Sequence, residues 1–239
     1  MVLGCLEFYE KGEYSGLLVD CGEQGVYYDP PYGPNWWIYY FEPIFVGDDI
    51  QATKKRSEMS EWCRSVYLGR DAISRERAFE LIERYIQVKP DILNEADQFE
   101  NEKFQSDYIL GIHYRGTDKF TSGEADFISY ETMLEAVEVH LKQVKPNDYQ
   151  IFIATDELPF LHYMQEHFPD RVIYQDAERS TDAKPIHFNN PEPYRVGREA
   201  VVDALLLSRC HFLIRTFSNL SICSCYFNPN LPNQIICRY

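Results

Sequence analysis

The chain has 239 residues, a formal net charge of −15, and 45% hydrophobic residues. This length allows one large domain or two small ones, each with a packed core. The acidic balance excludes general nucleic-acid binding, which needs a basic surface, and no apolar run in the sequence is long enough for a transmembrane helix. An acidic chain can still bind one diphosphate locally, through a few cationic side chains and backbone N–H groups.

The N-terminal residues and the cysteines indicate the cellular compartment in which the protein is expected. Residues 1–7 become acidic too soon for a signal peptide. The seven cysteines are odd in number and irregularly spaced, and their spacing does not fit a zinc site. We therefore expect reduced thiols and a cytoplasmic protein.

Residues 1–104 are predicted to form a smaller N-terminal α/β part, short for a complete Rossmann-type unit. We expect a helix end at 3–9, a buried strand at 15–20, an aromatic loop at 25–37, a helix at 74–86 and a polar linker at 94–103. The Tyr and Trp side chains of the loop either stack on a sugar or pack into a small core that holds the loop. The residues alone favour packing.

Residues 105–239 alternate regularly between strand and helix patterns. Apolar, β-branched runs predict strands at 108–114, 149–154, 171–175, 211–215 and 234–237. Helical spacing predicts helices at 130–144, 158–168, 197–208 and 218–227. This alternation predicts an α/β fold, a parallel Rossmann-type sheet with helices on both faces.

Three of these strands end in polar clusters, at 113–119, 155–157 and 216–219. The carboxyl ends of parallel strands meet at one edge of a sheet, which is where such sheets bind ligands. Arg115 offers a rigid fork of donors for phosphate oxygens. Ser218 or Asn219 can cap the next helix, whose N-terminus favours an anion. Together these features favour a diphosphate ligand.

Asp203 lies inside the apolar helical run 201–207 and therefore needs a partner. That partner is either a nearby arginine such as Arg198 or a pair of ligand donors, such as the N1–H and amine of guanine. The residues alone favour the arginine.

A set of short motifs in this order resembles one known family. The motifs are 113–119 (HYRGTDK), 123–127 (GEADF), 154–156 (ATD), 202–203 (VD) and 216–218 (TFS). They are similar to the α-1,6-fucosyltransferase and nodulation-fucosyltransferase family, which is related to the protein O-fucosyltransferases. The resemblance implies a GT-B-like fold and an inverting fucosyltransferase that uses GDP-fucose on a carbohydrate or other hydroxyl acceptor, without a metal cofactor.

The resemblance also implies roles for single residues. Arg115, Glu124 and Lys119 are the implied catalytic residues, with Arg115 on the β-phosphate and Glu124 as general base. The implied donor-binding residues are His113, Arg115, Asp156, Arg198, Asp203, Thr216, Phe217 and Ser218. Gly116 stands where α-1,6 members often carry a second arginine, and Glu124 aligns only after a one-residue gap.

Two alternatives stay open. One is a non-catalytic protein on the same fold that binds a GDP-sugar or a glycan. The other is a transferase for a different GDP-sugar, because selection between a methyl and a hydroxymethyl group depends on pocket shape.

Overall fold

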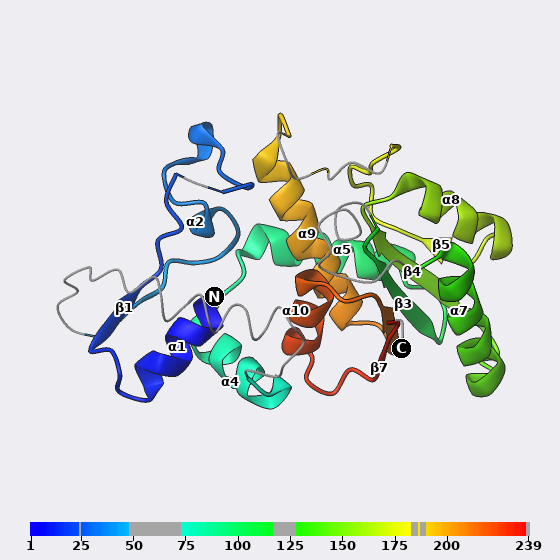
Figure 1. Ribbon diagram of the computed structural model, residues 1–239, viewed down its shortest axis with the longest axis horizontal. Helices are drawn as coiled ribbons and strands as arrows, with labels where there is room; N and C mark the ends of the chain where they lie inside the picture. The colour runs from blue at the N-terminus through cyan, green and yellow to red at the C-terminus, as the bar shows by residue number, and fades with distance from the viewer. Residues whose placement is uncertain (24, 48–72, 117–127, 183–185, 187–189, 238–239) are drawn as a thin grey trace.

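A five-stranded parallel sheet forms the centre of the larger part of the molecule (Figure 1). The computed structural model describes residues 1–23, 25–47, 73–116, 128–182, 186 and 190–237. The strand order is β5-β4-β3-β6-β7, and every neighbouring pair is parallel. The strands are β3 (Ile109–Tyr114), β4 (Gln150–Thr155), β5 (Val172–Ile173), β6 (Phe212–Arg215) and β7 (Asn233–Ile235). The predicted parallel α/β sheet is confirmed.

Helices cover both faces of this sheet, because alternate strand residues point to opposite sides. Leu110 and Ile112 of β3 pack in one core cluster with residues of α7 (Tyr130–Val144) and α8 (Leu158–His167). Ile109 joins the other cluster. That second cluster contains residues of α5 (Pro90–Lys103), α9 (Pro193–Ser208) and α10 (Asn219–Phe227).

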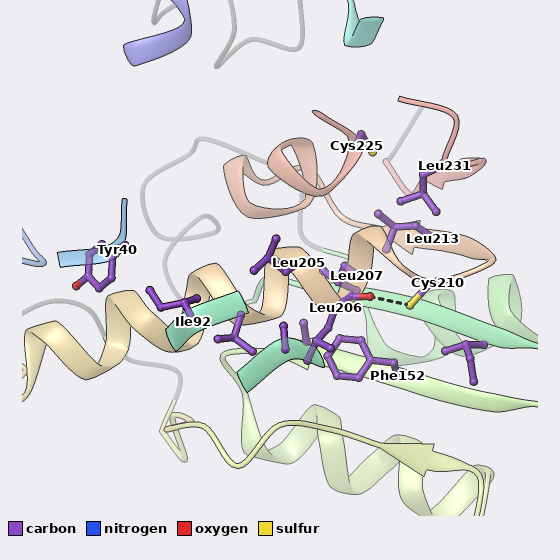
Figure 2. Close-up of a cluster of buried hydrophobic side chains, with 14 of the residues drawn as sticks. Tyr40, Ile92, Phe152, Leu205, Leu206, Leu207, Cys210, Leu213, Cys225 and Leu231 are labelled. Carbon is purple, nitrogen blue, oxygen red and sulfur yellow. Dashed lines mark hydrogen bonds between the residues drawn. The ribbon is translucent and has the colours of Figure 1, made fainter. Parts of the chain in front are cut away.

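Figure 2 shows the second cluster, in which α9 lies across the sheet. Leu205, Leu206 and Leu207 of α9 pack near Phe152 of β4, and the Cys210 thiol donates to the Leu206 carbonyl at 3.4 Å. Tyr40 belongs to the same cluster. The N-terminal part therefore shares this core with the sheet.

The N-terminal part is small and has its own core cluster around Leu6, Trp37 and Leu81. Its elements are α1 (Val2–Glu10), β1 (Gly16–Leu18), the 3₁₀ turn η1 (Pro30–Tyr32), α2 (Trp37–Tyr40), β2 (Phe45–Gly47) and α4 (Arg75–Tyr85). β1 pairs antiparallel with β2, and its residues are half-buried or exposed. The prediction of a strand at 15–20 is confirmed over Gly16–Leu18, but the prediction that it is buried is wrong, since in this range only Val19, which follows the strand, is buried.

The predicted linker at 94–103 is also wrong, since these residues belong to helix α5. Pro90 occupies the first turn, where its missing N–H costs nothing, and Ile92 and Ala96 are buried. The polar residues of the run form the outer face of the helix and pair with arginines, for example Asp97 and Glu100 with Arg209 at 2.7 and 2.8 Å. The proposed boundary between residues 104 and 105 stays a prediction.

Among the described residues, no helix is both long enough and apolar enough to span a bilayer.

Gly197 of α9 admits the ring of Tyr40, whose hydroxyl donates to the Tyr194 carbonyl at 3.1 Å. A Cβ at position 197 would overlap that hydroxyl. Gly197→Ala is therefore expected to lower the free energy of unfolding by about 1–3 kcal/mol, although alanine is the better helix former. Urea unfolding measures this change. Tyr40→Phe in the same chain removes the overlapping oxygen and should recover part of the loss; no recovery would contradict the packing explanation.

Candidate functional site

A cavity of about 570 Å³ lies at the carboxyl ends of β3, β4 and β6. One wall is this edge of the sheet, the next is formed by α9 and the start of α10, and the third by aromatic residues of the N-terminal part. The lining includes Tyr27, Trp36, Tyr40, His113, Arg115, Asp156, Ala177, Glu178, Glu199, Asp203 and Ser218. The site lies where an open parallel sheet is expected to bind a ligand.

Arg115 is held at the cavity by the neighbouring strand ends. Its backbone N–H donates to Thr216 Oγ1 at 3.0 Å, and its Nε lies 3.3 Å from Asp156 Oδ2. The other Asp156 oxygen, Oδ1, accepts from the Gly116 N–H at 3.4 Å. Asp156 is buried, and its ion pair orients the guanidinium of Arg115 at the cavity.

The start of α10 forms the second polar feature. Ser218 is buried and caps the helix, with its hydroxyl accepting from the Leu220 N–H at 3.3 Å. The remaining first-turn N–H groups and the helix dipole give this end partial positive charge. Arg115 and this helix end therefore give one cavity two features that attract an anion.

Asp203 supplies the cavity's buried acceptor. It lies on the buried face of α9, and its Oδ1 has no hydrogen-bond partner among the described residues. Burial raises the pKa of Asp203 to about 7, with the Arg179 charge lowering it and the Glu199 charge raising it. A buried carboxylate oxygen without a partner is costly in a folded chain, and a ligand with N–H donors would satisfy it.

The structure brings together most of the predicted donor-binding residues. The ones that line the cavity are His113, Arg115, Asp156, Asp203 and Ser218. Thr216 is buried beside them and contacts Arg115, whereas Phe217 is partly buried and is not among the lining residues. Their roles toward a donor stay predictions.

Arg198 is the exception among the described candidates. It is not among the lining residues, and it forms ion pairs with Asp91 and with Glu95, the latter at 2.7 Å, on α5. The expectation that Arg198 is the partner of Asp203 is wrong, because the guanidinium of Arg198 pairs with these two carboxylates of α5 instead. The side chain of Arg198 instead joins α9 to α5, away from the residues that line the cavity.

Lys119 and Glu124 lie outside the described residues. Their implied catalytic roles stay predictions that rest on the resemblance.

Two further residues near the site were missed from the sequence. Glu157 is buried, and its Oε2 accepts from the Tyr130 hydroxyl at 2.7 Å. Burial raises the pKa of Glu157, the Tyr130 hydrogen bond opposes this, and the Asp156 charge adds to it. A Cβ at Gly116 would overlap the Glu157 carboxylate, which therefore occupies the space beside this glycine. The sequence shows two adjacent acidic residues, Asp156 and Glu157. Only the fold shows that Asp156 pairs with Arg115 and that Glu157 accepts from Tyr130.

The second missed residue is Arg179, which follows β5. The stretch that contains Arg179 predicts only a loop. Its charge lowers the pKa of Asp203, a residue far away in the sequence, and no local pattern encodes such an effect.

Among the described residues, no group of three or more His, Cys, Asp and Glu side chains is arranged to hold a metal ion.

Fold and cavity together define a Rossmann-type α/β protein with a crevice site at the carboxyl edge of its sheet. Residues 80–228 match the family described as alpha-(1,6)-fucosyltransferase N- and catalytic domains. The chain therefore belongs to the α-1,6-fucosyltransferase family.

Individual relatives agree with this assignment. An alpha-(1,6)-fucosyltransferase of Caenorhabditis elegans is 28% identical over 130 residues, which is 52% of this chain and 22% of that protein. The chain thus matches about a fifth of the length of this curated relative.

Solved structures give the fold. The NodZ alpha-1,6-fucosyltransferase co-crystallized with GDP has a TM-score of 0.62 and 18% identity, covering 99% of this chain and 89% of that one. Fucosyltransferase NodZ from Bradyrhizobium likewise has a TM-score of 0.62 and 18% identity, covering 98% and 88%. The predicted GT-B-like α/β fold is confirmed.

Proposed function

We propose that this chain binds GDP-fucose in the cavity and transfers fucose, with inversion, to a hydroxyl group of a carbohydrate or other acceptor. The observation that carries the proposal is the convergence of Arg115, the α10 N-terminus and the unpartnered Asp203 oxygen on one cavity. Membership of the fucosyltransferase family supports it, as do the NodZ structures described as co-crystallized with GDP and soaked with GDP-fucose.

Each feature matches one part of such a donor. The diphosphate carries negative charge suited to a guanidinium and a helix N-terminus. Guanine presents adjacent N1–H and N2–H donors, which suit an ionised carboxylate such as Asp203. The aromatic wall of the cavity, at Tyr27 and Trp36, offers a flat apolar surface for the other rings of the donor.

Transfer needs charge stabilisation on the departing group. As the acceptor oxygen attacks the sugar carbon from the opposite face, the bond from that carbon to the diphosphate breaks and its electron pair stays on the diphosphate. Arg115 and the α10 N-terminus would neutralise that charge, which is the role a metal ion plays in other transferases. We therefore propose that no metal is required. The acceptor's proton passes to a carboxylate base, for which Glu124 remains the candidate, with Lys119 near it.

GDP is expected to raise the melting temperature of the chain, because a ligand that binds only the folded state stabilises it by mass action. The shift should exceed those given by UDP and ADP at equal concentration, since Asp203 fits the two donors of guanine. Thermal denaturation with each nucleotide, with and without EDTA, measures both points. Equal shifts for all three nucleotides would refute guanine recognition, and loss of the GDP shift in EDTA would refute metal independence.

A transfer assay distinguishes the enzyme from a binding protein on the same fold. The enzyme releases GDP from GDP-fucose in the presence of a suitable glycan, and more slowly by hydrolysis in its absence. Binding without release of GDP under either condition would favour the non-catalytic alternative, and faster release from GDP-mannose would favour another donor. The acceptor and a cytoplasmic location stay predictions.

A further inference from the structure

Two successive acidic residues lie against the two residues that follow strand β3. The strands β3 and β4 are paired in parallel up to their carboxyl ends, and the chain continues from both ends in step. Arg115 therefore meets Asp156, with Arg115 Nε 3.3 Å from Asp156 Oδ2. One residue further on, Gly116 meets Glu157. A Cβ at position 116 would lie 2.5 Å from Glu157 Cδ and 2.7 Å from its Oε2, so the carboxylate is packed directly against this glycine.

The carboxylate of Glu157 is held from its other side by Tyr130. The Tyr130 hydroxyl donates to Glu157 Oε2 at 2.7 Å. Tyr130 is the first residue of α7, and its ring packs edge-on against the rings of Tyr114 and Phe160, with centroids 5.5 and 5.3 Å away. Glu157 is 7% exposed, and its own N–H donates to Thr155 Oγ1 at 3.2 Å. Because the ring and the acid are both packed, the carboxylate has a fixed place beside the glycine.

The backbone of the turn at Arg115 and Gly116 depends on such packing. The Arg115 N–H donates to Thr216 Oγ1 at 3.0 Å, and the Gly116 N–H donates to Asp156 Oδ1 at 3.4 Å. The second hydrogen bond is long, and hydrogen bonds weaken at such distances. Contact with the Glu157 carboxylate therefore adds to what fixes this turn. A shift of the turn would also displace the guanidinium from the ion pair that orients it.

We propose that Glu157 is a positioning residue for Arg115. Its carboxylate, held by Tyr130, supports Gly116 and so fixes the turn that places the guanidinium at the cavity. Arg115 lines the cavity, whereas Glu157 is not among the lining residues, so Glu157 acts through Arg115 and does not touch the ligand. This inference rests on the proposed function for the identity of the ligand.

Calorimetric titration of GDP and guanosine tests the proposal on Glu157→Ala and Glu157→Gln. Alanine has no side chain that reaches Gly116, and the misplaced guanidinium should weaken GDP binding about tenfold. Guanosine has no phosphate for Arg115 to bind, so its affinity should stay unchanged. Glutamine keeps the shape of glutamate, and its amide oxygen can accept from Tyr130. Glu157→Gln should therefore keep most of the GDP affinity.

Two tyrosine variants provide the matched comparison. Tyr130→Phe removes the hydrogen bond that holds the Glu157 carboxylate and should weaken GDP binding, although less than Glu157→Ala does. The Tyr85 hydroxyl also donates to a carboxylate, Glu10 Oε1 at 2.8 Å, but neither of these residues lines the cavity. Tyr85→Phe should therefore leave GDP affinity unchanged. A Glu157→Ala loss that is equal for GDP and guanosine would show a merely structural role, and an equal loss in Glu157→Gln would show that packing is not the cause. Either result would overturn the proposal.

Urea unfolding without nucleotide provides a readout independent of the proposed ligand. Gly116→Ala places a Cβ where the carboxylate lies, and Glu157→Asp withdraws that carboxylate by one methylene group. Each change should lower the free energy of unfolding, and the double variant should lose less than the sum, because the two residues share one space. A wild-type chain that binds no GDP would refute the proposed function. Additive losses on unfolding, or a Glu157→Ala chain with wild-type GDP affinity, would instead refute the link between Glu157 and Arg115.

Discussion

Replacing Arg115 with alanine is expected to abolish donor turnover and to weaken GDP binding by roughly 30- to 1000-fold. The range corresponds to a loss of about 2–4 kcal/mol for a forked, charge-assisted contact to phosphate. Turnover should suffer most, because charge on the departing diphosphate grows as the bond to the sugar breaks. Calorimetry with GDP and a GDP-release assay measure the two effects.

Two further variants make this result interpretable. Arg115→Lys should recover only part of the affinity, because a single ammonium cannot reproduce the fork. Arg198→Ala removes another arginine that pairs with carboxylates, but one outside the cavity, and should leave GDP affinity unchanged. Urea unfolding checks that Arg115→Ala stays folded, since Asp156 loses its ion pair. A folded Arg115→Ala chain with wild-type GDP affinity would contradict the proposed donor site.

Local sequence patterns were sufficient to predict the sheet and the edge at which the cavity lies. β3 is buried along its whole length, so its composition reads as a strand without reference to distant residues. Ser218 caps α10 as its position predicted. The convergence of Arg115, Asp156 and Ser218 then follows from the geometry of parallel strands, which brings their carboxyl ends to one edge.

Contacts between distant segments could not be predicted in the same way. The run 94–103 is polar because its outer face pairs with arginines such as Arg209, far away in the sequence, and polarity alone suggested a linker. For Asp203 the residues alone favour a nearby arginine such as Arg198 over a pair of ligand donors, whereas Arg198 pairs with Asp91 and Glu95 on α5. Side-chain pairing across segments depends on how α9 lies over the sheet, which hydrophobic periodicity does not specify.

The glycine at position 116 can be explained only together with Glu157, its neighbour in space. From sequence, the glycine was a departure from the family pattern that left the phosphate site with one arginine fewer. In the structure, the Glu157 carboxylate fills the space where a side chain at 116 would begin, and it is held there by Tyr130. The two residues must therefore be read together, because any side chain at 116 would displace a buried acid.

Asp203→Asn is expected to change binding and stability in opposite directions. GDP affinity at pH 8 should fall on the order of 100-fold, because the amide loses the charge and can turn an N–H group toward the donors of guanine. UDP affinity should change little, so the preference for guanine is lost. Calorimetry with both nucleotides measures this, and the exposed Asp176 provides a control as Asp176→Asn.

The stability of the same variant should rise at pH 8. Burial raises the pKa of Asp203 from its ordinary 3.8 to about 7, so the folded chain binds the proton more tightly than the unfolded chain does. The stability from that proton is fully present below about pH 4 and is lost as the pH rises through 7. Asparagine carries no charge at any pH and avoids this loss, a gain of at most about 4 kcal/mol at pH 8 and little at pH 4. Urea unfolding at both values measures it.

The two results together decide why the chain carries an aspartate at this position. If Asp203 served only to pack the core, replacing it would lower the free energy of unfolding, and a loss of GDP binding would then follow from local unfolding. Weaker GDP binding in a chain that is more stable at pH 8 has no such explanation, because the folded state has become more favourable. A variant that is less stable at both pH values would contradict the assignment and make Asp203 part of the core. A gain in stability with lost guanine preference would mean that the buried carboxylate costs the fold stability and serves the ligand.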